Sequence, residues 1–560
     1  MSWLAALAVV AAAGVSCWQY WRWTHRRMLE LAAKVPGPPA LPILGNALIF
    51  MRNPGDILNK IEELYNIYGE YFKFWLGPDL NICVKNPTDI RALLTSNKVN
   101  QKGPLYEVLI PFIGYGILSG GPSWRNHRKI ATPTYNKKSV EHFTPIFNKE
   151  AEHIALVLSR KDPNVSFDAY KDIVKCTTQS VNQTLLGLSK EDSQNLYRLD
   201  ELVSQTRSMY DLIFSKMTRW WLQIPIIYWL TGRKSLQNYY IQLLDDFSSD
   251  IVKRRRQALE LSTPDEECMG IVDRFILSGQ MSEQEIKWDT ITLFTTSQEA
   301  AAKMASGVLL ILAHLPEWQD KVYHEMMEIV GGHGPVNSEQ LKQMQYLDMV
   351  YKETLRYFAI AALIQRTVEE EITINEGKLT LPAGTSLVLP IHHLHRDPRY
   401  WEDPYKVMPE RFLPENVKKR DPNAFVPFSL GPMDCLGRVY ATALIKTIVV
   451  WVLRYVHLEP VGTLDNIKLN AAISVSAADG YNIRTRPRAQ KNGSIRTNGR
   501  INVVVRVLRY VHLEPVGTLD NIKLNADISV SAADGYNIQT RPMEQKNGSI
   551  RKNGRINGLS

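Results

Sequence analysis

Hydrophobic residues recur at helical spacing through most of the chain. From Glu141 to Leu277 one amphipathic segment follows another, which predicts a series of helices. Trp288–Leu315 is a longer and mainly apolar run that ends before Pro316, and it predicts one long helix. A further apolar helix is expected at Val439–Val452.

Strand-like patterns are short and few. Tyr71–Leu76 and Leu80–Val84 follow a polar helix at Ile57–Tyr68. Near the C-terminal end, Ala477–Tyr481 reads AADGY, in which Asp479–Gly480 is a strong turn signal and predicts a hairpin. Helical patterns therefore far outweigh strand patterns.

The N-terminal segment has the pattern of a membrane anchor. Ser2–Trp21 is uncharged and mostly apolar, and about 20 such residues span a bilayer as a helix. Aromatic residues suited to the interface lie at its C-terminal end: Trp18, Tyr20, Trp21 and Trp23. Arginines suited to the cytosolic side follow the run: Arg22, Arg26 and Arg27. A cleaved signal peptide is the alternative, but its positive charge would precede the apolar core. We expect an uncleaved anchor with its basic flank at 1–27, then a proline-rich connector at 28–46.

Composition and charge narrow the class of protein further. The chain has 560 residues, of which 45% are hydrophobic and 22% are charged, as in a globular protein. Its formal charge is +9, but no basic stripe interleaved with aromatic residues is present, so nucleic-acid binding is not expected. The five cysteines are scattered without a CxxC pair, which fits a reducing compartment: Cys17, Cys83, Cys176, Cys268 and Cys435.

The candidate chemistry centres on Phe428–Gly437, which reads FSLGPMDCLG. Its glycines let the backbone approach a flat cofactor closely. The helix expected after Cys435 offers N–H groups that stabilise a thiolate and lower its pKa. A thiolate of this kind suits haem iron, where it favours cleavage of the O–O bond. The alternative is that a lone cysteine is a buried and inert small hydrophobe.

This loop resembles the haem-binding loop of cytochromes P-450, Phe-x-x-Gly-x-Arg-x-Cys-x-Gly. Four positions match as they stand: Phe428, Gly431, Cys435 and Gly437. The resemblance implies that Cys435 is the axial ligand of haem b, iron protoporphyrin IX. One position departs, because Met433 stands where the family has an arginine that helps to neutralise a haem propionate.

Two further motifs of the family lie upstream in the expected order. The first motif is Glu353 and Arg356 in KETLRY, whose spacing alone is unspecific because any surface ion pair could share it. The second motif is MPERF, which supplies Arg411 and makes the ordered set specific. The resemblance implies that these three side chains form a buried network on the proximal side of the haem. Such a network is structural, and removing one partner would strand a buried charge.

The resemblance also assigns partners to the haem propionates. Trp124 and Arg128 are four residues apart and share one helix face. Taken without their context, such a pair is more often surface stacking. Arg366, in LIQRTV, occupies a strand position from which relatives reach a propionate. Because Met433 lacks a charge, Arg128 and Arg366 are expected to share the missing arginine's role.

The long helix at Trp288–Leu315 corresponds to the one that crosses the haem face in the family. Its small-Gly-x-acid-Thr sequence aligns with 296–300, so the acid is Glu299 and the threonine is replaced by Ala300. Glu299 is either a proton-relay group or an outward-facing carboxylate, because burial without hydration or a partner is costly. The threonine guides proton delivery in the family, and Ala300 lacks its hydroxyl.

The resemblance covers about Trp3–Arg488 and is closest to the insect members of the branch that includes fatty-acid omega-hydroxylases. It implies a mainly α fold with a small β-rich lobe, the cytochrome P-450 fold, with haem between two long helices in a catalytic domain at 47–488. The implied reaction inserts one atom of dioxygen into a C–H bond of a small apolar substrate.

The resemblance also implies partners and a location. Electrons would come from NADPH through a separate NADPH–cytochrome P-450 reductase, with cytochrome b5 as a further candidate donor. The chain has no evident glycine-rich dinucleotide fingerprint after a strand, which fits borrowed electrons. Membrane lipid is expected around a single N-terminal anchor in the endoplasmic reticulum, with the catalytic domain in the cytosol.

A second function stays open at this point. Ala300 and Met433 are also compatible with a haem-binding protein of impaired oxygen activation, one that rearranges peroxides, binds ligands or is a decaying gene product. The substrate stays open too, since a fatty acid, an isoprenoid, an odorant and a xenobiotic all suit an apolar pocket.

The C-terminal end repeats itself. Val452–Asn502 recurs as Val507–Asn557 with five substitutions, at 472/527, 484/539, 488/543, 489/544 and 497/552. The second copy has no counterpart of the cysteine loop, so it brings no second haem site. We expect a polar tail at 489–502 and a duplicated, dispensable segment at 503–560.

Overall fold

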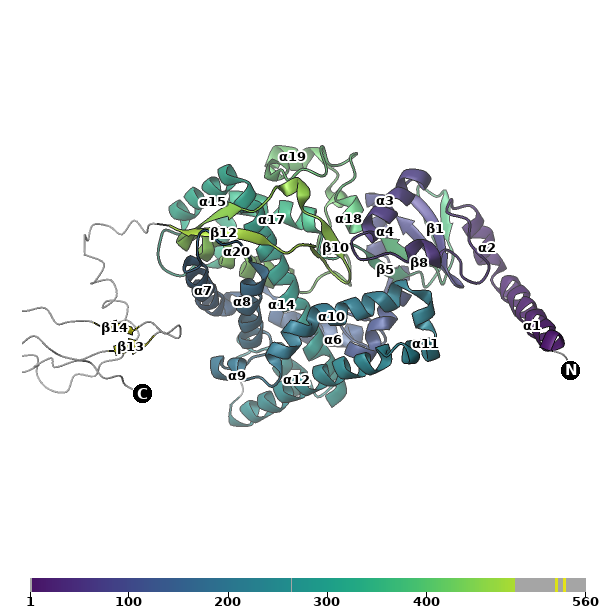
Figure 1. The fold of residues 1–560 in the computed structure, drawn as a ribbon, viewed down its shortest axis with the longest axis horizontal. Coiled ribbons are helices and arrows are strands. Elements are labelled where there is room, and N and C mark those ends of the chain that lie inside the picture. Colours follow the sequence, from purple (N-terminus) through teal and green to yellow (C-terminus); the bar gives the residue numbers. More distant parts are fainter. Residues whose placement is uncertain (1–2, 263, 489–528, 532–536, 540–560) are drawn as a thin grey trace, which may run out of the picture. The chain divides into compact units, whose positions relative to one another are not determined.

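The computed structural model describes residues 3–262, 264–488, 529–531 and 537–539. The chain divides into two units, 1–490 and 491–560, which are considered separately. The first unit is mainly helical, with its small sheets gathered beside α2–α4 at one end and around α20 (Figure 1). The predicted fold class, mainly α with a small β-rich lobe, is confirmed.

The helices of the first unit are α1 (Trp3–Thr24), α2 (Arg26–Ala33), α3 (Ile57–Tyr68), α4 (Pro87–Thr95), α5 (Ile110–Ile113), α6 (Trp124–Ala131), α7 (Lys137–Ser159), α8 (Tyr170–Thr184), α9 (Lys190–Gln194), α10 (Leu199–Thr218), α11 (Pro225–Leu230), α12 (Arg233–Leu261), α13 (Ile271–Ser278), α14 (Glu283–His314), α15 (Pro316–Ile329), α16 (Ser338–Gln343), α17 (Gln345–Phe358), α18 (Ile391–Leu394), α19 (Pro414–Lys419) and α20 (Arg438–Tyr455). The strands are β1 (Tyr71–Leu76), β2 (Asp79–Val84), β3 (Gln101–Lys102), β4 (Phe167–Asp168), β5 (Ile364–Thr367), β6 (Ile372–Ile374), β7 (Leu379–Leu381), β8 (Ser386–Leu389), β9 (Val456–Pro460), β10 (Leu469–Ala471), β11 (Val475–Ala477) and β12 (Asn482–Pro487).

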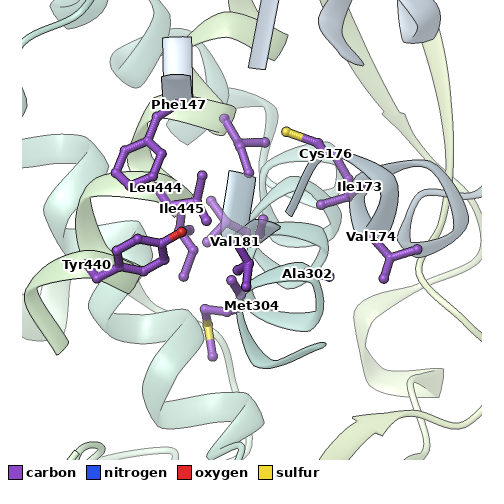
Figure 2. Close-up of a cluster of buried hydrophobic side chains, with 14 of the residues drawn as sticks. Phe147, Ile173, Val174, Cys176, Val181, Ala302, Met304, Tyr440, Leu444 and Ile445 are labelled. Carbon is purple, nitrogen blue, oxygen red and sulfur yellow. The ribbon is translucent and has the colours of Figure 1, made fainter. Parts of the chain in front are cut away.

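The long apolar helix expected from the sequence is α14, and it runs through the core. It begins with a capping box, in which the Ser282 side chain accepts from the Glu285 N–H and the Glu285 carboxylate accepts from the Ser282 N–H. Helices α8, α17 and α20 pack against it. Figure 2 shows the apolar cluster that α7, α8, α14 and α20 share, with Phe147, Ala302 and Tyr440 among its members. This core fixes α14 relative to α20.

The β-rich lobe is a five-stranded sheet in the order β1-β2-β8-β5-β3. Its first two strands and the helix before them have the predicted positions, except that β2 starts at Asp79, one residue early. The pairing of β5 with β3 is antiparallel and sets Arg366 beside Lys102. That pairing brings two cations together from segments far apart in the sequence.

The predicted hairpin at Ala477–Tyr481 is wrong. β11 pairs with β10, whereas β12 pairs with β9 and β4, so the strands on either side of Asp479–Gly480 belong to different sheets. Gly480 does turn the chain, with a φ of 86°, which an L-residue rarely adopts. The sequence therefore predicts the turn at Asp479–Gly480 correctly. The strands on either side of it, β11 and β12, pair with other strands rather than with each other. The real hairpin is β10–β11.

The segment expected to be a membrane anchor folds as α1. Within the part of the chain whose side chains are described, no helix is both long enough and apolar enough to cross a membrane. At its C-terminal end, the Trp21 ring meets the Trp75 ring of β1 edge-on, with centroids 5.9 Å apart.

The duplicated segment at 503–560 and the polar tail lie mostly outside the described residues. Two short strands are described, β13 (Ser529–Ser531) and β14 (Asn537–Gln539), and they pair with each other. Their counterparts in the first copy fall in β11 and β12, which belong to different sheets. The two copies therefore adopt different strand pairings.

Truncation after Asn502 should leave the melting temperature within about 2 °C of the full chain, the shift expected for less than about 1 kcal/mol. The first copy already supplies β9 to β12, and it is bonded into the core, because the Gln319 side chain pairs with both the N–H and the C=O of Leu458. Deletion of 452–506 should instead abolish cooperative unfolding. Equal melting curves for the two deletions would show that the copies are interchangeable.

Candidate functional site

A cavity of about 350 Å³ lies between α14 and the cysteine loop. The α14 wall includes Thr296, Ser297 and Ala300, and the loop wall includes Phe428 and Cys435. Gly437 and Arg128 also line it. The structure therefore gathers residues from α6, α14 and the loop around one space, as the sequence predicted for Ala300, Arg128, Phe428, Cys435 and Gly437.

The loop depends on Gly431 for its path. Gly431 has a φ of 75°, and a Cβ built on it would lie 2.0 Å from the Leu94 carbonyl oxygen, so only glycine fits. Beyond it, the Asp434 N–H donates to the Gly431 carbonyl at 3.1 Å and the Cys435 N–H to the Phe428 carbonyl at 2.8 Å. The chain then enters α20. This turn presents the Cys435 side chain to the cavity.

Cys435 lies deep in the protein, yet its side chain is accessible because it faces the cavity. Burial raises the pKa of the Cys435 thiol; the Gly437 N–H, at the start of α20, and the charges of Arg128 and Arg438 oppose the rise without cancelling it. The start of α20 thus lowers the pKa of Cys435, as predicted, but burial raises it by more. A buried thiolate needs a positive partner, which a metal ion supplies.

The donor set fits a haem better than a metal held by protein alone. No group of three or more His, Cys, Asp or Glu side chains within the described ranges could hold a metal ion. Cys435 would therefore be a single protein ligand, and the remaining ligands would have to come from a cofactor such as a porphyrin. The apolar wall formed by Leu293, Ala301 and Met304 suits the face of such a ring.

Two cations, Arg128 and Lys102, line one side of the cavity, and Arg366 is not among the lining residues but lies beside Lys102. Arg128 donates to the Asp434 carbonyl at 2.7 Å and to its carboxylate at 2.5 Å. Arg366 is buried and donates to the carbonyls of Gln365 at 3.0 Å and Met433 at 3.4 Å, and the Tyr106 side chain is a further hydrogen-bond partner. Among the described residues, Arg366 forms no ion pair. Burial lowers the pKa of Arg366, as expected for a cation away from water.

Lys102 is the third cation, and the sequence reasoning missed it. Its ammonium lies 4.8 Å from the centre of the Tyr106 ring and forms no ion pair within the described part of the chain. Burial and then the charges of Arg366 and Arg128 hold the pKa of Lys102 well below its usual value. Among the described residues, the Asp434 carboxylate is the one ion-pair partner of these three charges, so the site is suited to a ligand that carries carboxylates, such as the haem propionates.

Trp124 is not among the residues that line the cavity. Its ring lies under the guanidinium of Arg125, 5.6 Å from the centroid, so the structure brings Arg128 to the cavity but not its predicted partner. Helix α6 is held against α14 by His127, whose Nδ1 lies 2.6 Å from the Asp289 carboxylate. Burial alone would lower the pKa of His127, but Asp289 and then Glu285 raise it.

Glu299 is buried, with 6% exposure, and lies off the cavity wall. Its carboxylate is 2.5 Å from the Lys303 ammonium and accepts from the Ser474 hydroxyl at 3.4 Å. Lys303 also donates to Ser474 at 2.5 Å. The charge is therefore compensated, and the group ties α14 to the turn between β10 and β11. Its role as a proton relay stays a prediction.

The predicted buried network of Glu353, Arg356 and Arg411 is confirmed, and its position on the proximal side of a haem stays a prediction. Arg356 donates to both carboxylate oxygens of Glu353, at 2.8 and 2.7 Å, and both side chains are fully buried. Arg411 approaches the same carboxylate at 3.5 Å, and the Met408 N–H donates to it at 2.8 Å. These contacts anchor α17 to the segment that leads into the cysteine loop.

A mainly helical fold with one cysteine thiol facing a cavity, and more cations than carboxylates at its side, is the arrangement expected of a haem-thiolate protein. The family model described as Cytochrome P450 matches residues 35–479, so the chain belongs to the cytochrome P450 family. This confirms the resemblance seen in the cysteine loop. Family membership makes the protein a monooxygenase, an oxidoreductase that uses haem with a cysteine thiolate ligand.

Similar proteins come from insects and vertebrates. Cytochrome P450 4c3 of Drosophila melanogaster is 27% identical over 492 residues, covering 82% of this chain and 91% of the relative. Probable cytochrome P450 4d20 of the same species is 28% identical over 497 residues, covering 84% and 96%. Cytochrome P450 4V2 of Homo sapiens is 28% identical over 495 residues, covering 83% and 91%.

Arg356→Lys should destabilise the protein by about 3–5 kcal/mol, because lysine cannot reproduce the paired bonds and leaves Glu353 buried without its partner. Urea unfolding followed by circular dichroism measures this. Arg198→Lys is the matched control: Arg198 also donates twice to one carboxylate, that of Glu201, and once to Asp246, but these partners are partly exposed to solvent. The control should cost less than about 1 kcal/mol. Similar losses in both variants would contradict the assignment.

Proposed function

We propose that the protein inserts one oxygen atom of dioxygen into a C–H bond of a small apolar substrate. Electrons would come from NADPH through a separate NADPH–cytochrome P-450 reductase, with cytochrome b5 as a second donor. The observation that carries the proposal is the Cys435 thiol, which faces a largely apolar cavity across from α14. The relatives' names support the family but do not name a substrate.

Haem b, when bound, supplies the activation of dioxygen. Cys435 would hold its iron as a thiolate, and the path set by Gly431 would keep the thiolate aimed at the cavity. Arg128 would hold the haem carboxylates, with Arg366 reaching them from beside Lys102. Lys102 would be the third cation and would replace the arginine that is Met433 in this chain.

The remaining predicted cofactor-binding residues, Phe428, Gly437 and Trp124, are proposed to have smaller roles. Phe428 and Gly437 line the cavity and would bound the cofactor on the thiolate side. Trp124 remains proposed as a propionate partner, which would require its ring to leave the position under Arg125.

Proton delivery is the step for which this chain is least well equipped. Ala300 lines the cavity without a hydroxyl, and the Thr296 hydroxyl donates to the Thr292 carbonyl at 2.7 Å. Glu299 is proposed as the relay group from behind the wall, through movement of its contacts with Lys303 or Ser474. Poor coupling of NADPH consumption to product formation is the expected consequence.

We also propose attachment to the endoplasmic reticulum membrane through the N-terminal segment, with the catalytic domain in the cytosol. The α1 helix exposes Trp3, Val9, Val15, Tyr20 and Trp23, which suits a lipid environment.

Cys435→Ala should abolish the thiolate-type Soret band of the reduced carbon-monoxide complex, because no other cysteine lines the cavity within the described residues. Cys268→Ala, an exposed cysteine away from the site, is the control and should keep the band. Far-UV circular dichroism checks that both variants fold. A full band in Cys435→Ala would refute the proposed ligand and the function built on it.

Ala300→Thr should raise the product formed per NADPH consumed, because it restores a hydroxyl at the cavity wall. A positioned proton donor contributes about 10²–10⁴-fold in the best cases, which bounds the gain. Ala300→Val has nearly the same shape without the hydroxyl and should not help. The assay uses a substrate identified by its shift of the haem spin state. Tight coupling in the natural protein, with a substrate that lacks any hydroxyl, would contradict this expectation.

The same assay distinguishes the proposed monooxygenase from the second candidate function. A haem protein of impaired oxygen activation would form no product from any substrate that shifts the spin state, with or without the threonine. The presence of Ala300 and Met433 at the cavity is the observation that keeps this candidate in view.

A further inference from the structure

A second hollow, of about 680 Å³, lies apart from the haem cavity. It is bordered by α10, the start of α12, the segment at 52–54 and strand β10. Arg52, Arg219 and Arg233 line it, together with apolar side chains such as Leu212 and Phe214. Arginines from three separate segments thus meet at one partly apolar space that the oxygenase chemistry does not use.

Within the described part of the chain, the positive charge of this hollow exceeds the negative charge. None of the three arginines forms a salt bridge with a described residue, and the wall carries one carboxylate, that of Asp211. From Leu212 to Leu236 the chain has four basic residues and no acidic one: Lys216, Arg219, Arg233 and Lys234. Such a concentration of guanidinium groups favours an anion, and guanidinium binds phosphate through paired hydrogen bonds.

Lys216 shows how crowded the positive charge is. Its ammonium lies 4.4 Å from the centre of the Tyr228 ring, and burial, followed by the charge of Lys234, lowers the pKa of Lys216. The wall also holds one polar atom without a partner among the described residues, the buried Oδ1 of Asn470. Because this oxygen accepts hydrogen bonds but has almost no accessible surface, a hydroxyl on the ligand would satisfy it once the Asn470 side chain turned toward the hollow.

Exposed apolar side chains surround the hollow on two sides. From Arg219 to Arg233 the chain reads RWWLQIPIIYWLTGR. Within this stretch, the α11 side chains of Ile226, Trp229 and Leu230 are exposed. On the other side, Ile43 and Leu48 are exposed shortly before Arg52. Apolar side chains that face solvent beside basic ones are typical of a surface that rests in the headgroup region of a bilayer.

We propose that this hollow binds the headgroup of an anionic phospholipid, with the phosphate on Arg219 and Arg233 and a headgroup hydroxyl on Asn470. The apolar border would rest among the acyl chains. Phosphatidylinositol has the required phosphate and hydroxyls. The inference rests on the membrane location proposed above but not on the haem chemistry. Failure of the Cys435 test would therefore leave the lipid site standing, and failure of the lipid titration would leave the haem ligand standing.

The test is calorimetric titration of the full-length, haem-loaded protein in neutral detergent with dihexanoyl phosphatidylinositol. Saturable binding of one lipid per chain is expected, and dihexanoyl phosphatidylcholine should bind much more weakly. Basic residues at anionic lipid surfaces contribute about fivefold each, so Arg219→Gln with Arg233→Gln should weaken binding about 25-fold. Lys253→Gln with Lys149→Gln is the matched control, since it also removes two charges, both from exposed sites that do not line the hollow, and Lys253 is about 30 Å along α12 from Arg233.

Several outcomes would overturn the proposal. Equal affinity for the two lipids would show that the headgroup charge is not recognised. Inorganic phosphate that binds as tightly as the lipid would show a site for free anions. Unchanged affinity in the double variant would place the binding elsewhere. If that variant loses its Soret spectrum, Arg52→Gln in the exposed segment serves instead, and it should weaken binding about fivefold.

Discussion

The buried guanidinium of Arg356 is the constraint on which the site depends. It has no exposed surface and uses all five N–H donors, on Glu353 and on the carbonyls of His395, Pro404 and Lys406. His395 passes the constraint on, because its Nε2 accepts from the Val426 N–H at 3.1 Å. Burial and then the charge of Arg356 hold the pKa of His395 well below its usual value, which keeps the ring neutral and able to accept. Val426 leads directly into the cysteine loop.

The cavity is electrostatically incomplete without a cofactor. A thiol whose pKa is raised by burial lies on one wall, and three cations with one carboxylate lie at its side. The clustered cations cost free energy, and burial holds the thiol in its neutral form. The haem that we propose would relieve both, since its iron would offset a thiolate and its two carboxylates would offset the cations. Met433 brings no charge to this arrangement, and Lys102 is a cation that the cavity wall retains.

The parts that local sequence determines were predictable, and the parts that depend on distant pairing were not. The helix at Ile57–Tyr68, the long α14 and the cysteine loop follow from periodicity, from glycine spacing and from the match to a known motif. The hairpin was misassigned because β11 and β12 find partners in different sheets. Lys102 was missed because its neighbour Arg366 reaches it only through pairing of β3 with β5. A motif match likewise locates Glu299 on its helix but says nothing of Lys303 or Ser474.

The β10–β11 hairpin joins the two hollows of the molecule. Ala471 donates to the Pro54 carbonyl at 2.8 Å and Asn470 lines the basic hollow, while Val475 donates at 2.9 Å to the carbonyl of Ile360, which lines the haem cavity. At its turn, Ser474 contacts Lys303 and Glu299 of α14. A lipid bound to Asn470 could influence the haem cavity only if the hairpin had two conformations. The lipid would also have to bind one of these conformations more tightly than the other. The Ser474 contacts oppose such movement, because shifting the turn would break both its bonds to a buried ion pair. The hairpin is therefore better built to hold the cavity wall in place than to transmit a signal.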